Sequence, residues 1–147
     1  IGVIHDGRIE QWDRPYNLYH RPVTRFVADF VGAGVFVPGR LRQAGGTRQV
    51  VFALGEVPTH AHADLPDGAA VEVLLRPDDV VHDDAAPTQA TVVRKLFRGA
   101  EFLYTLRLDS GEELLSLVPS HHNHAVGERI GVRLELDHVV TFPASSG

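Results

Sequence analysis

The hydrophobic residues of this chain follow two different patterns, which change at Gly32. Before that glycine, five hydrophobic residues lie at the i, i+3, i+4, i+7 and i+8 positions of one helical face: Val23, Phe26, Val27, Phe30 and Val31. After it, hydrophobic and polar residues alternate over short runs that are separated by glycine-containing turns. The first pattern is typical of an amphipathic helix and the second of half-buried strands. The chain is therefore predicted to join a short helical segment to a β-rich unit.

The residues before the amphipathic helix are predicted to form a β-hairpin. Asp6-Gly7 separates two short hydrophobic runs, and Asp-Gly favours a two-residue turn because both central residues need a positive φ angle. That turn would place Ile4 opposite Ile9 and Ile1 opposite Trp12 on the paired strands. A lone hairpin is only marginally stable in water, so this one is expected to pack on another element.

Two short helices are predicted to follow the hairpin. Asp13 is expected to cap the first helix, with Pro15 in its first turn, where backbone N–H groups lack helical partners. Pro22 should end this helix, because a proline disfavours helical geometry in the residue before it. The same proline suits the first turn of the second helix, and Gly32 suits its C-terminal cap.

The rest of the chain is predicted to form a mainly β fold. Strands are expected at residues 35–41, 49–54, 71–75, 91–97, 102–108, 113–118, 130–136 and 139–142, with a loop at 59–68. Pro38 lacks a backbone N–H, so the first strand should lie at a sheet edge or carry a bulge there. Seven or more short strands with turns between them indicate an OB-like small β-barrel or a sandwich of antiparallel strands.

Composition and charge narrow the possible functions. The chain has 147 residues, enough for one ordinary domain and a smaller segment, and its 19 acidic and 14 basic residues give a net charge of −5. A nucleic-acid-binding surface is not expected from this balance. The sequence has no cysteine, which excludes disulfides, thiolate nucleophiles and cysteine-bound zinc within it. No hydrophobic run approaches the roughly 20 residues of a membrane-spanning helix.

No catalytic or cofactor-binding residue is predicted. The phosphate-binding pattern G-x-x-x-x-G-K-[ST] is absent, since the only lysine, Lys95, follows Arg94 in a predicted strand. Ser120 lies beside His121 but lacks the strand–turn–helix context of a nucleophile elbow. This sequence alone is therefore not expected to hydrolyse ATP.

Histidines are the main candidates for a metal site. His121, His122 and His124 lie close together, and His60 and His62 would share one face of an extended segment. Imidazole nitrogen suits zinc, copper, nickel and iron, so metal sensing is one interpretation. Adjacent histidines point in different directions, however, and no cysteine is present. A solvated loop is therefore favoured, and no metal is predicted.

The turn Arg76-Pro77-Asp78 has two interpretations. As a simple surface turn, it would end a strand, and Arg76 would pair weakly with Asp78 or Glu72. Alternatively, the turn shapes the β-rich unit and contacts another element of the assembly, and this structural role is favoured over ligand contact. The acidic pairs at 78–79 and 83–84 are predicted to be charged turns rather than a site for a hard cation.

Both halves of the sequence resemble the C-terminal part of ATP-binding subunits from bacterial ABC importers for ferric iron, polyamines, sulfate and sugars. The matching positions in the first half are Gly7-Arg8-Ile9-x-Gln11, Pro15, Leu18-Tyr19, Pro22, Phe26-Val27-Ala28 and Phe30-Val31-Gly32. Those in the second half are 73–79, with the Arg76-Pro77-Asp78 turn, and 99–108, 110–111, 127–128 and 140–143. The resemblance implies that residues 1–34 are the tail of a nucleotide-binding domain and 35–147 a TOBE/OB-like regulatory domain.

The resemblance also implies cofactors and partners for a full-length subunit. ATP and Mg²⁺ would bind to a nucleotide-binding domain that lies outside this sequence. The subunit would be cytoplasmic, and peripheral on the inner membrane through permease subunits that work with a periplasmic binding protein. Four residues are expected to pack on the nucleotide-binding domain, on the β-rich unit or on a second copy, in a homodimer that could exchange this segment: Trp12, Phe26, Val27 and Phe30.

Residues 97–101 are most similar to ferric-iron members, so ferric iron uptake is the transport role that the resemblance favours. Two other functions stay open. A small oxyanion- or metal-binding sensor has a related fold, and metal binding lost on replacing His121, His122 and His124 would favour it. An OB-fold nucleic-acid binder is disfavoured by the negative charge, the single lysine and the lack of aromatic residues interleaved with basic ones.

Overall fold

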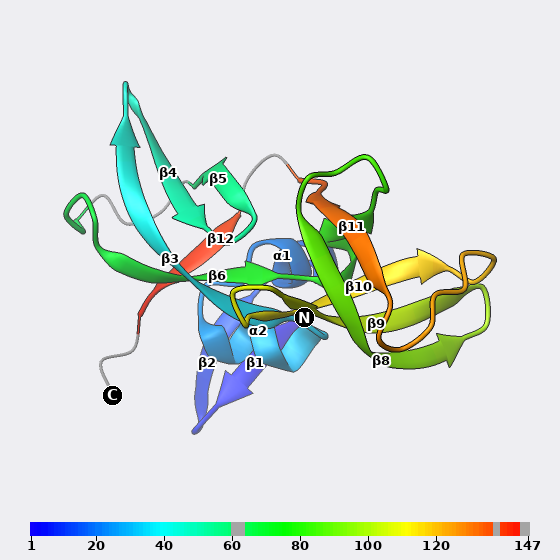
Figure 1. Ribbon diagram of the computed structural model, residues 1–147. Coiled ribbons are helices and arrows are strands. Elements are labelled where there is room, and N and C mark those ends of the chain that lie inside the picture. The colour runs from blue at the N-terminus through cyan, green and yellow to red at the C-terminus, as the bar shows by residue number, and fades with distance from the viewer. Residues whose placement is uncertain (60–63, 137–138, 145–147) are drawn as a thin grey trace.

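Two five-stranded sheets lie side by side in the molecule, and a hairpin with two short helices packs against them (Figure 1). The computed structural model describes residues 1–59, 64–136 and 139–144. All strand pairs in these ranges are antiparallel. The prediction of a mainly β fold with a preceding hairpin and two helices is confirmed. Neither helix of the described chain is long and hydrophobic enough to span a membrane.

The N-terminal segment, residues 1–34, contains the hairpin and both helices. Its elements are β1 (Gly2–His5), β2 (Arg8–Trp12), α1 (Pro15–His20) and α2 (Arg25–Val31). The hairpin turn is the predicted one, since Asp6 and Gly7 have φ angles of 52° and 75°. Positive φ at both positions matches the twist of the flanking strands, which explains why this dipeptide connects them.

The register of the hairpin is only partly as predicted. Ile4 lies opposite Ile9, but a β-bulge next to this pair shifts the rest of the ladder by one residue. Gly2 therefore lies opposite Trp12, and the prediction that Ile1 would do so was wrong. A Cβ on Gly2 would lie 2.7 Å from the indole ring of Trp12, so the ring occupies the space that a side chain at position 2 would take.

Both helices begin later than the sequence suggested. Pro15 is the first residue of α1, but the N-cap is Arg14 and Asp13 accepts a hydrogen bond from the Arg14 backbone N–H instead. The N-cap of α2 is Thr24, whose hydroxyl accepts a hydrogen bond from a backbone N–H of the first turn. Pro22 therefore lies outside both helices. A threonine cap two residues later satisfies a backbone donor that a proline start would have left free.

The first lobe is the sheet with strand order β12-β6-β3-β4-β5. Its strands are β3 (Val35–Ala44), β4 (Thr47–Phe52), β5 (Gly55–Pro58), β6 (Ala70–Leu75) and β12 (Val140–Pro143). Its edges meet, because the Val139 N–H donates to the Pro58 carbonyl and the Thr59 and Thr141 hydroxyls lie 3.0 Å apart. Pro38 lies where β3 pairs only with β6, which confirms a local edge.

The second lobe is the sheet with strand order β10-β9-β8-β11-β7. A short 3₁₀ turn, η1 (Pro77–Asp79), leads into β7 (Val80–His82), β8 (Gln89–Arg98), β9 (Glu101–Leu108), β10 (Glu113–Pro119) and β11 (Arg129–Leu134). The buried Ser116 hydroxyl donates to the Val80 carbonyl at 2.5 Å, which brings β10 against β7. All of these strands lie between β6 and β12 in sequence, so the second lobe is inserted into the first.

One continuous hydrophobic core joins the two lobes. Its largest fully buried side chains come from both of them: Tyr104, Leu41, Leu75, Leu106 and Leu114. Burying a side chain of this kind contributes roughly 1.5–3 kcal/mol, so the core is the main source of stability for both lobes. The strands β5 and β7 were not predicted, because each is too short to show an alternating pattern.

Candidate functional site: the Arg76 junction

Arg76 lies at the end of β6, where the N-terminal segment meets the first lobe. Its side chain is 4% exposed, so it is not the surface residue that the first interpretation required. Nη1 donates to the carbonyls of Gly32 and Ala33 at 2.9 and 3.0 Å, and Nη2 donates to the carbonyl of Tyr19 at 3.3 Å. One guanidinium therefore binds α1 and the linker to the first lobe. The fixed fork of arginine suits this geometry, and lysine could not reproduce it.

The turn after β6 holds the arginine in place. Asp79 Oδ2 accepts a hydrogen bond from the Arg76 backbone N–H at 2.8 Å, and the Asp79 N–H donates to the Arg76 carbonyl at 3.0 Å. Pro77, which is buried, is the first residue of the turn and fixes its φ angle. Burial raises the pKa of Asp79 and lowers the pKa of Arg76. Both shifts reflect how far the turn is withdrawn from water.

Tyr19 covers the guanidinium from α1. The Arg76 Cζ lies 4.5 Å from the centre of the tyrosine ring, a cation–π contact. The Tyr19 hydroxyl donates to Asp78 Oδ1 at 3.0 Å, so Asp78 contacts the helix rather than Arg76. Burial, followed by the hydrogen bond to the Asp78 carboxylate, raises the pKa of Tyr19 to about 12. All three residues of the Arg76-Pro77-Asp78 turn thus help to attach the N-terminal segment.

The linker that follows α2 is tightly packed. Gly32 caps the helix as predicted, in an extended conformation, and a Cβ there would lie 2.9 Å from the Tyr19 ring. A Cβ on Gly34 would lie 3.1 Å from the Leu74 side chain and 3.3 Å from the Leu75 carbonyl. By sequence, Ala33-Gly34 is expected to be a hinge or a tight link. The structure shows a tight link.

Further contacts hold α2 on the first lobe. Ala28 is buried against Leu74 and Phe142, which belong to β6 and β12. Arg25 forms an ion pair with Glu72, with 2.6 Å between Nη2 and Oε2. In this structure the N-terminal segment thus packs on the β lobe of its own chain. Exchange of the segment between two copies would have to replace each of these contacts.

The four residues predicted to pack between domains have different environments. Val27 is fully buried, and Phe26 is half-buried with its ring stacked on His5, at 3.9 Å between centres. Phe30 is 68% exposed and Trp12 is 74% exposed. The predicted helical stripe is therefore only partly covered within this chain. The buried face of α2 centres on Val27 and Ala28, which pack on the hairpin side and on the first lobe.

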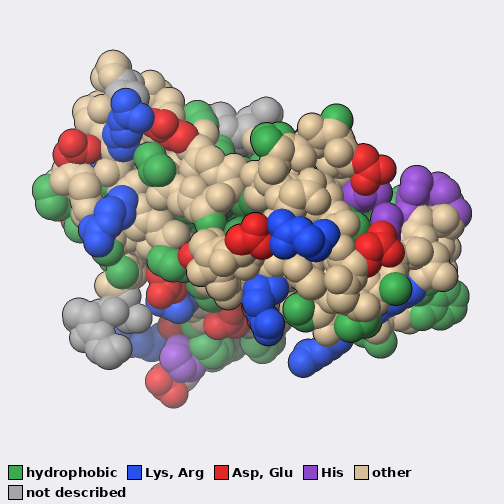
Figure 2. Space-filling view, viewed as in Figure 1, with side chains coloured by type: hydrophobic (Ala, Val, Ile, Leu, Met, Phe, Trp, Pro, Cys, Tyr) green, Lys and Arg blue, Asp and Glu red, His purple; other side chains and the backbone are tan. Residues whose placement is uncertain are grey.

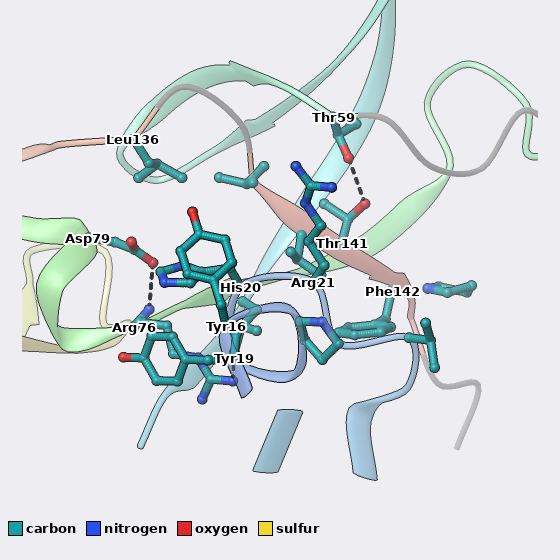
Figure 3. A pocket seen from close by; sticks show the side chains of 16 residues that line it. Tyr16, Tyr19, His20, Arg21, Thr59, Arg76, Asp79, Leu136, Thr141 and Phe142 are labelled. Carbon is teal, nitrogen blue, oxygen red and sulfur yellow. Dashed lines mark hydrogen bonds between the residues drawn. The ribbon is translucent and has the colours of Figure 1, made fainter. Parts of the chain in front are cut away.

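A groove of about 940 Å³ opens beside the junction, between α1 and β12 (Figure 3). Tyr16, His20 and Arg21 form one wall, and the Tyr16 ring points into the space. Phe142 lies on the opposite side, and Asp79 lies at the end nearest to the junction. The walls combine aromatic, basic and aliphatic groups without a paired nucleophile and base. Among the described residues that line the groove, none is arranged for covalent catalysis.

A histidine cluster occupies the far end of the second lobe (purple, right, in Figure 2). His82 from β7 lies 4.6 Å from His124 and 5.9 Å from His122, measured between ring centres. His124 Nδ1 lies 2.5 Å from a Glu128 carboxylate oxygen, and this hydrogen bond lowers the pKa of Glu128. His82 Nε2 lies 2.6 Å from Asp84 Oδ1.

The candidate metal ligands are thus only partly assembled. His122 and His124 come together with His82, whereas His121 has its ring contact with His122, at 4.3 Å between ring centres and a tilt of 44°. His82 lies about forty residues before the other three histidines, and no local motif could have identified it. Among the described residues, no three histidine, aspartate or glutamate side chains are placed to hold one metal ion. His60 and His62 lie outside the described residues.

The two acidic pairs are occupied by protein contacts. Asp83 Oδ2 accepts from Arg133 at 3.1 Å, and Asp83 Oδ1 accepts from the Ala85 N–H at 2.9 Å. With Asp84 paired to a histidine and the 78–79 pair bound in the junction, all four carboxylates have partners. The interpretation as charged turns therefore describes their contacts, and a cation would have to displace existing hydrogen bonds.

Comparison with known proteins shows which families and structures this chain resembles. Residues 73–142 match the family model of the TOBE domain. The chain is 33% identical over 122 residues to a spermidine/putrescine import ATP-binding protein, PotA, of Marinobacter nauticus, covering 79% of this chain and 33% of the relative. It is 32% identical over 129 residues to PotA 2 of Pseudomonas aeruginosa, covering 82% of this chain and 36% of the relative.

These matches concern only part of each relative. The chain spans about a third of the length of the two relatives. They support the resemblance to the C-terminal region of ABC importer ATP-binding subunits. They give no support to ferric iron, because both relatives are named for spermidine and putrescine.

A solved structure has a similar fold. The cytoplasmic molybdate-binding protein ModG, with molybdate bound, has a TM-score of 0.57 and 14% identity. The match covers 75% of this chain and 96% of ModG. At this level of identity the likeness shows the fold alone, and it confirms the OB-like architecture.

Proposed function

We propose that this chain is the C-terminal regulatory region of the ATP-binding subunit of an ABC import system. The observation that carries the proposal is the Arg76 junction, which packs the N-terminal segment tightly against the TOBE domain. The outer side chains of that segment are exposed to solvent. Trp12 and Phe30 are the largest of these side chains. The two import ATP-binding proteins that match this chain support the same assignment.

The exposed hydrophobic side chains of the N-terminal segment pack against a nucleotide-binding domain of the same polypeptide. That domain binds ATP and Mg²⁺, and the hairpin face with Ile4, Ile9 and Trp12 packs against it. Packing these exposed side chains away from water stabilises the contact by roughly 25 cal/mol for each Å² of apolar surface buried. Because Arg76 bonds α1 and the linker to the first lobe, movement of the nucleotide-binding domain carries the β lobes with it.

The other partners follow from the same assignment. A second copy of the subunit forms a homodimer through the β lobes. The dimer binds its permease subunits, which lie in the inner membrane, from the cytoplasmic side. A periplasmic binding protein delivers the substrate. The N-terminal segment packs on its own chain, so this dimer does not require exchange of the segment.

The class of transported substrate is the most specific part of the proposal. Polyamines come first because of the two similar import proteins, and ferric iron, favoured by residues 97–101, comes second. The decisive experiment reconstitutes the full-length subunit with its permease and binding protein in vesicles, and measures ATP-dependent uptake of labelled putrescine, spermidine and Fe³⁺. Uptake of a polyamine supports the first choice, and uptake of Fe³⁺ alone would replace it with the second.

Two variants test the regulatory role in the same assay. Replacing Arg76 with glutamine should raise ATP hydrolysis that is not accompanied by uptake, because the junction can no longer transmit movement. Arg40→Gln is the control, since Arg40 is exposed and its side chain donates to the Gly68 carbonyl at 3.0 Å. A full-length protein without ATPase activity that instead binds molybdate or Zn²⁺ saturably would favour a sensor module over an importer subunit.

A further inference from the structure

The outer half of β8 is an open sheet edge. β11 pairs with β8 only at residues 89–91, and the last backbone contact on that side joins Val92 to Gly127 and Glu128. Beyond a bulge between Val92 and Arg94, β8 continues to Arg98 with β9 as its single strand neighbour among the described residues. In Figure 1 this part of β8 runs along the lower right margin of the molecule. An edge of this kind leaves backbone N–H and C=O groups free for another strand.

The side chains of this edge are basic and hydrophobic. Leu96 is 54% exposed and Phe97 is 66% exposed. Arg94 and Arg98 are exposed and form no ion pair with the residues that the structure describes. A concentration of positive charge at this point contrasts with the net charge of −5 of the whole chain.

The pattern of side chains specifies the strand that would fit. Lys95 and Phe97 lie on the face of Phe102, with 4.3 Å from Lys95 Nζ and 5.5 Å from the Phe97 ring to the Phe102 ring centre. Because strand residues alternate, Arg94, Leu96 and Arg98 lie on the other face. That face offers positive, hydrophobic and positive positions in order. An added strand would match it with acidic, hydrophobic and acidic residues at alternate positions.

We propose that the edge of β8 from Arg94 to Arg98 binds an extended acidic segment of a partner protein by strand addition. Charge selects this occupant. A second copy of the chain, paired through the same edge, would set Arg94, Lys95 and Arg98 against each other, and like charges opposite one another are destabilising. A bilayer surface offers no backbone partners for the open edge. Main-chain hydrogen bonds supply affinity in such complexes, and alternate side chains supply specificity.

This inference goes beyond the proposed function, because it concerns a surface that neither the junction nor the nucleotide-binding contact uses. It would give the second lobe a means of receiving a signal from a protein outside the transport complex. The inference stands or falls independently of the substrate that is transported.

The test uses a synthetic peptide that contains the sequence Glu-Val-Leu-Val-Glu. We expect saturable binding to the chain, with NMR shifts of backbone amides concentrated at residues 93–98. Two control peptides isolate the mechanism. In one, lysine replaces both glutamates, which should abolish binding. In the other, alternate backbone nitrogens are methylated, which removes the donors for strand pairing and should also abolish it.

Paired protein variants complete the test. The double variant Arg94→Glu/Arg98→Glu should weaken peptide binding at least tenfold, whereas Arg14→Glu/Arg40→Glu, which changes the net charge equally at exposed sites elsewhere, should not. NMR dispersion shows that each variant is folded. Equal binding by both double variants, or unchanged binding of the methylated peptide, would overturn the proposal. So would a dimer in sedimentation equilibrium that Leu96→Lys disrupts, or binding to phosphatidylglycerol vesicles without binding to the peptide.

Discussion

The N-terminal segment and the two β lobes differ in how completely they bury their own hydrophobic residues. The segment holds seven of the eleven large hydrophobic side chains that are exposed in the described chain: Ile1, Ile4, Ile9, Trp12, Tyr16, Val23 and Phe30. Its own small core has only three fully buried members, whereas a single large core fills both lobes. The lobes bury most of their large hydrophobic side chains in a core of their own, whereas the segment leaves most of its own exposed for a partner. The stability of this chain therefore comes mainly from the lobes, and its assembly with a partner depends mainly on the segment.

The largest expected effect tests whether the lobes carry the stability. Leu106→Ala should lower the free energy of unfolding by about 3 kcal/mol, because it removes fully buried methyl groups and leaves a cavity. Ile9→Ala, on the exposed hairpin face, should change it by less than about 0.5 kcal/mol. Urea unfolding followed by circular dichroism measures both. Equal losses in the two variants would show that the hairpin belongs to the same cooperative unit as the core.

Arg76→Met tests the connection between the two regions. The change leaves three partly buried carbonyls without their charged donor, which should cost about 2–3 kcal/mol. Hydrogen exchange should then speed up across α1 and α2 more than in the second lobe. Arg40→Met, which removes one exposed hydrogen bond, is the matched control. Uniform exchange in both regions would contradict a role for Arg76 that is local to the junction.

A smaller effect is expected from the linker. Gly32→Ala places a methyl group 2.9 Å from the Tyr19 ring and should destabilise the chain by about 1–2 kcal/mol through overpacking. Gly46→Ala, where nothing lies within 4 Å of the added carbon, should be close to neutral. Thermal unfolding of the two variants gives the comparison. If the first variant is as stable as the second, the linker has more freedom than its contacts indicate.

The smallest effect is a pH dependence at high pH. Tyr19 has a pKa of about 12 in the folded chain, above its value of about 10 in an unfolded one. An acid with a raised pKa holds its proton more tightly when folded, so its contribution is complete below pH 10 and is lost as the pH rises through 12. Phenolate absorbance should show a titration near pH 12 that Tyr19→Phe removes. If Tyr19→Phe instead removes a titration near pH 10, Tyr19 lies in water.

Local features could be predicted from the sequence, and long-range ones could not. The turn at Asp6-Gly7 needs only its own φ angles, and the alternation in β9 correctly marks a strand with one buried face. The burial of Arg76 depends on carbonyls more than forty residues away, and its side chain alone predicts exposure. For the same reason His82 could not be grouped with His124. Short strands such as β7 take their conformation from β11, which pairs with them.

The order of strands also sets the order in which the chain can fold. β12 belongs to the first lobe but follows all of the second lobe in sequence, so β6 lacks one of its neighbours until the last strand has been synthesised. During that interval the hydrophobic edge of β6 is open to wrong partners. Closure then requires contacts between residues far apart in sequence, which slows folding. A ribosome-bound chain that ends before Val140 should therefore remain protease-sensitive in the first lobe while the second is already resistant.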